Sequence, residues 1–156
     1  MLKQYIADVG FQAPPFTTSL ELVERIRAAM PAKFAYLVED LFETITLYDS
    51  RAIEATATPL GGDRWRVDLV LESTKLRADG KGTEEEVPMD DWLPIGVMGE
   101  DEEGEPLYLE WHRITDGRTE LSLEVSGEPV KAGVDPRVLF IDRDPDDNVR
   151  DVEIKE

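Results

Sequence analysis

The sequence contains no cysteine and a single histidine, His112. Without cysteine there is no disulfide framework, no thiolate zinc site and no cysteine nucleophile. No apolar run approaches the roughly 20 residues that span a bilayer, and the start of the chain lacks the apolar core of a signal peptide. We therefore expect a soluble segment that does not itself insert into a membrane.

Basic residues are also scarce. The chain has 17 Lys and Arg against 35 Asp and Glu, which gives a net charge of −18, and residues 101–156 alone carry 7 basic and 17 acidic residues. Such an excess of carboxylates repels phosphate groups, so we expect neither nucleic acid nor an anionic membrane surface as a partner. With 156 residues and a 41% apolar fraction, the chain can still bury a hydrophobic core.

Two helices are predicted in the first third of the chain. The segment Thr18–Glu21 is a capping box, and an apolar stripe follows it as far as Met30. Pro31 ends this helix and can open the next, because apolar residues recur at intervals of three and four over residues 34–45. Residues 1–17 have weak periodicity and a proline pair, which predicts an extended connector.

After residue 49 the apolar period changes from helical to two, which is typical of strands. The alternating segments are 53–58, 64–71, 107–112 and 120–125, with short apolar runs at 138–141 and 152–154. Trp92–Met98 is also predicted as a strand, one that Pro94 breaks or places at an edge. Six to eight short strands favour a mainly antiparallel, β-sandwich-like (immunoglobulin-like) domain.

These patterns predict an α+β chain in three parts. Residues 1–17 are the connector, residues 18–49 a helical hairpin and residues 50–156 the antiparallel β domain.

Sequence motifs of catalysis are absent: there is no H-E-x-x-H, no G-x-S-x-G, no Walker loop and no G-x-G-x-x-G. His112 lies in an alternating segment with no Ser or Cys beside it, which favours a half-exposed strand residue over a general base. Glu84–Glu86 with Asp90-Asp91 are predicted as solvated acids rather than a catalytic carboxylate pair. Trp92 is predicted as a core residue rather than an interface anchor.

An acidic turn near the end of the chain has a spacing that resembles a calcium loop. Positions 1, 3, 5 and 12 of an EF-hand count are occupied by Asp142, Asp144, Asp146 and Glu153. Position 6 is Asp147 where the loop needs glycine, and Pro145 stiffens the turn. The sequence therefore favours a solvated acidic turn over a weak calcium site.

Four blocks of sequence carry a family resemblance. They are Asp40–Asp49 with Arg51-Ala52; Asp79–Gly82; Val87-Pro88 with Asp91–Val97; and Lys131–Pro136 with Ile141-Asp142-Arg143 and Asp146-Asp147-Asn148. In order and spacing they resemble the C-terminal end of bacterial proteins that fuse an ABC-type transporter permease to a zinc aminopeptidase of the membrane alanyl aminopeptidase type. The similarity covers about residues 17–156. Arg137–Phe140 departs from it, because that family has a more polar run after the Asp-Pro.

In that family an H-E-x-x-H helix and a downstream Glu bind zinc, and the motif Glu activates water. This chain has none of those motifs, so we assign it no catalytic, cofactor or metal residue. The resemblance implies a non-catalytic C-terminal accessory or scaffolding domain of a parent metallopeptidase anchored in a bacterial cell membrane. Its partner would be the peptidase catalytic domain of the same parent chain, contacted through Phe11, Pro14, Pro15 and Phe16. The alternative is a free-standing acidic module that binds calcium or a cationic peptide.

Overall fold

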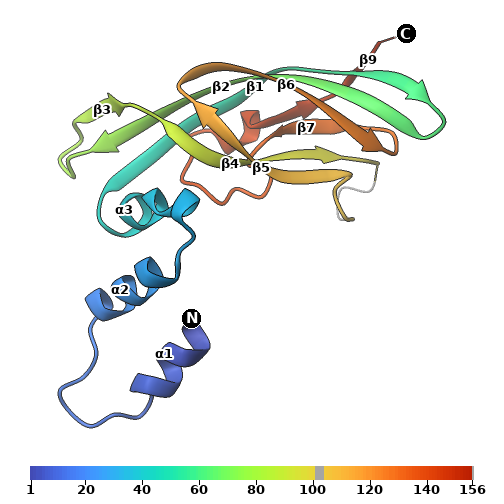
Figure 1. The fold of residues 1–156 in the computed structure, drawn as a ribbon. Helices are drawn as coiled ribbons and strands as arrows, with labels where there is room; N and C mark the ends of the chain where they lie inside the picture. The colour runs from blue at the N-terminus through green and yellow to red at the C-terminus, as the bar shows by residue number, and fades with distance from the viewer. Residues whose placement is uncertain (101–103, 156) are drawn as a thin grey trace. The chain divides into compact units, whose positions relative to one another are not determined.

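The computed structural model describes residues 1–100 and 104–155, and the chain divides into two compact units, Met1–Ile45 and Thr46–Glu156. The first unit is helical and the second contains two β-sheets (Figure 1). The predicted α+β class, with N-terminal helices and a mainly antiparallel sheet domain, is therefore confirmed. Among the described residues, every helix is too short or too polar to cross a membrane.

The helical unit begins with a helix that the sequence did not predict. Its elements are α1 (Leu2–Val9), α2 (Ser19–Ala29), η1 (Ala32–Phe34) and α3 (Tyr36–Phe42). The capping box of α2 is confirmed, since the Glu21 carboxylate accepts the Thr18 backbone N–H at 3.3 Å. An ion pair of 2.7 Å between Arg25 and Asp8 joins α2 to α1.

Two boundaries differ from the expected ones. Helix α1 lies inside the expected connector, because its two turns are too short for the apolar period to stand out from the prolines that follow. The helical pattern traced to Ile45 ends at Phe42, and strand β1 begins at Ile45. The β-branched run Thr44–Thr46 favours the extended conformation over another helical turn.

The β unit consists of two sheets that share a core. The strands are β1 (Ile45–Gly61), β2 (Arg64–Ala78), β3 (Glu84–Val87), β4 (Asp90–Met98), β5 (Tyr108–Thr115), β6 (Gly117–Ser126), β7 (Lys131–Val134), β8 (Val149–Asp151) and β9 (Glu153–Ile154). One sheet has the order β3-β2-β1-β9 with β6 also paired to β2, and the other has the order β5-β4-β7-β8. The β1–β9 ladder is parallel, whereas the ladders β2–β3, β2–β6, β4–β5, β4–β7 and β7–β8 are antiparallel.

Alternate residues of the long strands form the core, as period-two burial requires. From β2 and β4 the large apolar side chains that are fully buried are Val67, Leu69, Leu71, Leu93, Ile95 and Val97. One ion pair lies inside this apolar layer: Lys75 Nζ of β2 is 2.9 Å from Asp91 Oδ2 of β4. The Tyr48 hydroxyl of β1 donates to the same oxygen at 3.0 Å, so three strands from two sheets meet at one carboxylate.

Pro94 lies in the middle of a sheet, contrary to the prediction that it breaks its strand or places it at an edge. Strand β4 runs unbroken between β5 and β7, and Pro94 pairs with Trp111 in register. The described ladder to β7 ends at Ile95, just before Pro94. The Pro94 carbonyl accepts the Asp135 N–H at 2.7 Å, so the missing proline N–H falls where the ladder has ended.

The free edge of β1 is covered by the last part of the chain. Tyr48 exchanges backbone hydrogen bonds with Ile141 and Arg143, and the Ser50 N–H donates to Asp142 Oδ2 at 3.0 Å. Further along the strand, the Arg150 guanidinium donates to carbonyls of β1, and β9 then pairs with it. Covering an edge in this way prevents strand addition by other chains.

Candidate binding site

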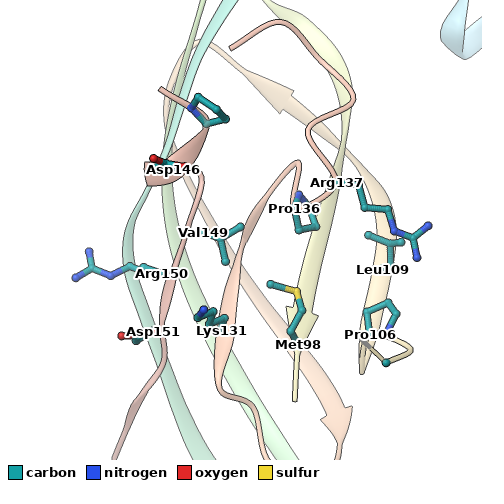
Figure 2. A pocket seen from close by; sticks show the side chains of 12 residues that line it. Met98, Pro106, Leu109, Lys131, Pro136, Arg137, Asp146, Val149, Arg150 and Asp151 are labelled. Carbon is teal, nitrogen blue, oxygen red and sulfur yellow. The ribbon is translucent and has the colours of Figure 1, made fainter. Parts of the chain in front are cut away.

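A pocket of about 650 Å³ lies on the face of the β5-β4-β7-β8 sheet that points away from the core. Its apolar walls come from Met98, Pro106, Leu109, Pro136 and Val149, and its charged lining residues are Lys131, Arg137, Asp146, Arg150 and Asp151 (Figure 2). Its volume is in the range of small-molecule and peptide pockets. The mixture of apolar walls and a few charges is typical of a binding site.

Two glycines allow the segments around the pocket to approach the sheet closely. A Cβ on Gly96 would lie 2.6 Å from the Pro136 ring, and a Cβ on Gly133 would lie 2.0 Å from the Asn148 carbonyl oxygen. Strand β8 and the segment before it therefore pack tightly on β7 only because residue 133 has no side chain. The pocket lies beside these contacts and is bounded by backbone that has little room to move.

The loop Asp135–Ile141 borders the pocket and is held in one conformation. The buried Asp135 carboxylate accepts the N–H groups of Leu139 and Phe140, each at 2.9 Å, and the Val138 N–H donates to the Asp135 carbonyl at 3.0 Å. The sequence predicted a strand over 138–141, which is wrong: these bonds fold the backbone into a turn, with φ of +42° at Asp135 and +49° at Val138. A β-branched residue at positive φ is strained, and such strain is found at functional loops.

The same loop exposes apolar side chains to solvent. Val138 is 54% exposed, Leu139 55% and Ile141 60%, whereas Phe140 between them is 6% exposed. The Phe140 ring packs edge-to-face on Tyr48 with a centroid distance of 4.9 Å and also approaches Trp111. The buried ring and the Asp135 hydrogen bonds anchor the loop that carries these three exposed apolar residues.

Burial also affects the charge of Asp135. It raises the pKa of the Asp135 carboxyl above its ordinary value of 3.8, while the hydrogen bonds from Leu139 and Phe140 oppose that shift. The two N–H groups thus offset part of the cost of burying a carboxylate. The loop geometry depends on this side chain, because it alone accepts both N–H groups.

His112 is half-buried on β5, as the sequence predicted. Its Nε2 lies 2.6 Å from the Tyr108 hydroxyl on the same strand. Burial lowers the pKa of His112 from 6.5, and the charge of nearby Glu110 opposes this shift. Burial and Glu110 also raise the pKa of the Tyr108 hydroxyl. Both groups are therefore neutral near pH 7 and hydrogen-bond to each other.

Lowering the pH from about 7 to about 5.5 is expected to destabilise the fold through His112. Because its folded pKa lies below 6.5, the unfolded chain binds the proton more readily between the two pKa values. The free energy of unfolding therefore falls as the pH drops from 6.5 towards the folded pKa. Thermal unfolding across this range should show a smaller decrease in His112→Gln. NMR titration of the ring protons provides the check: a folded pKa at or above 6.5 would contradict the prediction.

The acidic turn does not bring its four EF-hand-like carboxylates together. The two Asp142 oxygens accept the N–H groups of Ser50 and Asp144, and Glu153 lies on β9 opposite Thr56. Oriented with its nitrogen towards them, the Asn148 amide donates to Asp142 and to the Ser50 carbonyl. Within residues 1–100 and 104–155 no group of three or more His, Asp or Glu is placed to hold a metal ion.

The other acidic residues singled out in the sequence lie on separate elements. Glu84–Glu86 form part of the exposed strand β3, where Glu84 pairs with Arg143. Asp90 forms an ion pair with Arg113 across the β4–β5 ladder, and that bond lowers the pKa of its carboxyl. Its neighbour Asp91 is buried in the core.

Trp92 was predicted as a core residue, which is wrong: it is half-buried on β4, on the face that points away from the core, as the pocket does. The aromatic and proline residues expected at an interdomain contact are exposed. Phe11 and Phe16 are 109% and 69% exposed in the segment between α1 and α2, with Pro14 and Pro15 between them. A contact of these four residues with a peptidase domain stays a prediction.

No protein-family model, no curated protein and no solved structure matches this chain. The site is therefore interpreted from its own geometry. The sequence alone did not predict the pocket or the 135–141 loop. One signal for the loop was present, because the run after Asp135-Pro136 is apolar where the family that the chain resembles has a polar run.

Proposed function

We propose that this chain is a non-catalytic accessory domain that acts by binding a protein surface. The observation that carries the proposal is the 135–141 loop, which exposes Val138, Leu139 and Ile141 while its backbone is held by Asp135. A folded chain gains nothing from apolar side chains in water, whereas a fixed apolar patch suits a protein interface. The adjoining pocket supports the same reading.

The resemblance to permease–aminopeptidase fusions suggests which surface is bound. We propose that the partner is the zinc-peptidase domain of the same parent protein, and that this chain shapes access to its cleft or holds it in place. The exposed Phe11–Phe16 segment is a second candidate contact.

The proposal can be tested on the gene and then on the protein. The reading frame upstream of Met1 is expected to encode an H-E-x-x-H segment preceded by permease-like helices, and a frame without them would contradict the assignment. The encoded peptidase domain is then titrated with this chain by isothermal calorimetry. The double variant Val138→Asp with Leu139→Asp should weaken binding by at least about 30-fold, as loss of an interface hot spot does.

A matched control separates this effect from a general loss of apolar surface. Leu60, which is 37% exposed near the β1–β2 turn, is changed to Asp and should leave the affinity unchanged. Val138→Asp should also fold readily, because Asp tolerates a positive φ better than Val. Equal affinities for the double variant and the unchanged chain would show that the loop is not the contact.

A further inference from the structure

Arg137 differs from every other arginine in the chain. Each of the other ten arginines has a hydrogen-bond, ion-pair or other interaction partner. Arg137 makes no such interaction with the residues that the structure describes. It is exposed, follows the Asp135-Pro136 corner and lines the pocket. A guanidinium at a pocket wall that has no anionic partner among the described residues is suited to bind an anion from a ligand.

The charges of the pocket are separated by its apolar floor. Figure 2 shows Arg137 on the side of Leu109 and Pro106, and Asp146 of η2 and Asp151 of β8 on the opposite side. Lys131 of β7 lies on that opposite side as well, paired in register with Asp151. The Arg150 guanidinium points away from the pocket, towards the β1 carbonyls to which it donates. The pocket therefore has one guanidinium at one end, and two carboxylates with one ammonium group at the other.

The floor between these ends is apolar. Met98 and Pro136 lie between the two charged sides. A ligand that fits has one anionic group, an apolar group next to it, and a hydrogen-bond donor or cation further away.

We propose that the pocket binds the C-terminal segment of a polypeptide. The terminal carboxylate pairs with Arg137, the apolar last side chain contacts Met98, Leu109 and Pro136, and a preceding basic side chain or backbone N–H reaches Asp146 and Asp151. A chain terminus carries its carboxylate and its last side chain on one carbon atom, so both fit the pocket together. The proposal rests on the proposed function, since it assumes that the chain works by binding protein.

The neighbouring loop argues for a polypeptide over a small amphiphile. Val138 and Leu139 follow Arg137 directly in the chain, and their side chains are exposed outside the pocket. A small ligand buried in the pocket would not cover them, whereas the body of a protein that ends in the pocket would. A basic partner would also be attracted by the net charge of −18.

Fluorescence anisotropy with the full chain tests the proposal. The probe is a fluorescein-labelled octapeptide that ends in Lys-Ala-Ala-Leu with a free carboxylate, and the comparison peptide has the same sequence with a C-terminal amide. The amide peptide should bind the unchanged chain at least about tenfold more weakly than the free-acid peptide does. The free-acid peptide should bind the Arg137→Gln variant at least about tenfold more weakly than it binds the unchanged chain. The matched control Arg64→Gln removes an exposed guanidinium from the other sheet and should leave the affinity unchanged.

Two further arms identify the ligand class. The double variant Asp146→Asn with Asp151→Asn should lose more affinity for the lysine-containing peptide than for the same peptide with Gln in place of Lys. Octanoate, a carboxylate with only an apolar tail, should compete poorly. The assignment is overturned if the acid and amide peptides bind equally, if octanoate displaces the peptide at equal concentration, or if no binding occurs below about 1 mM.

These outcomes are distinguishable from those of the proposed function. If the free-acid peptide fails to bind while Val138→Asp with Leu139→Asp still weakens association with the peptidase domain, the C-terminus assignment is wrong and the accessory role stands. If the peptide binds and the peptidase domain does not, the pocket assignment stands and the partner is another protein.

Discussion

Replacing Lys75 with methionine is expected to lower the free energy of unfolding by about 3–5 kcal/mol. The Lys75 and Asp91 side chains are 6% and 5% exposed and lie 2.9 Å apart between the two sheets. Methionine fills a similar volume but leaves the Asp91 carboxylate buried with only the Tyr48 hydroxyl of this group to stabilise its charge. Urea unfolding followed by circular dichroism measures the loss.

The double variant Lys75→Met with Asp91→Asn provides the control. Asparagine removes the uncompensated charge and keeps an oxygen that can accept the Tyr48 hydroxyl, so the double variant should recover more than half of the lost stability. If the loss of unfolding free energy in the double variant equalled the sum of the losses from the two single changes, the loss would come from packing. The ion pair would then not be what joins the sheets.

Replacing Phe140 with alanine is expected to cost about 3–5 kcal/mol and to release the 135–141 loop. The ring is 6% exposed and is in edge-to-face contact with Tyr48 and Trp111, so its removal leaves a cavity between the loop and the sheet. Thermal unfolding measures the stability. Amide hydrogen exchange at Leu139 and Phe140 reports the loop, because the Asp135 carboxylate protects both N–H groups.

Two neighbouring substitutions make this prediction specific. Phe140→Leu keeps much of the buried volume and should cost less than about 1.5 kcal/mol. Leu139→Ala changes a side chain that is 55% exposed and should stay within about 0.5 kcal/mol of the unchanged chain. If Leu139→Ala lost as much stability as Phe140→Ala, the loop would bury Leu139 and not Phe140.

The spacing of apolar residues predicted the secondary structure correctly where one face of an element is buried. The alternation in residues 64–71 predicted a strand, and β2 buries Val67, Leu69 and Leu71 as expected. The capping box at Thr18 was also read correctly, because a cap uses only neighbouring residues. Helix α1 was not predicted although Leu2, Tyr5, Ile6 and Val9 recur at helical spacing, because it has only two turns and Gly10 and a proline pair follow it.

Pro94 and the 135–141 loop show where local reasoning fails. Proline is tolerated in the central strand β4 because the β7 ladder ends at the next residue, and that end is set by Asp135, which lies 41 positions further along the chain. Likewise, Val138–Ile141 have strand propensity, but two hydrogen bonds to one carboxylate turn the backbone instead. Tertiary contacts override propensity at both places.

The amino-acid order alone determined the kinds of element in this protein, the helix cap, the change of period after residue 49 and the absence of thiol chemistry. All of these depend on residues a few positions apart. Only the tertiary structure decided that Lys75 meets Asp91, that residues 141–155 cover the edge of β1, and that Arg137, Asp146 and Asp151 line one pocket. The reason is that such contacts depend on strand register and sheet packing, which are set by burial across the whole unit.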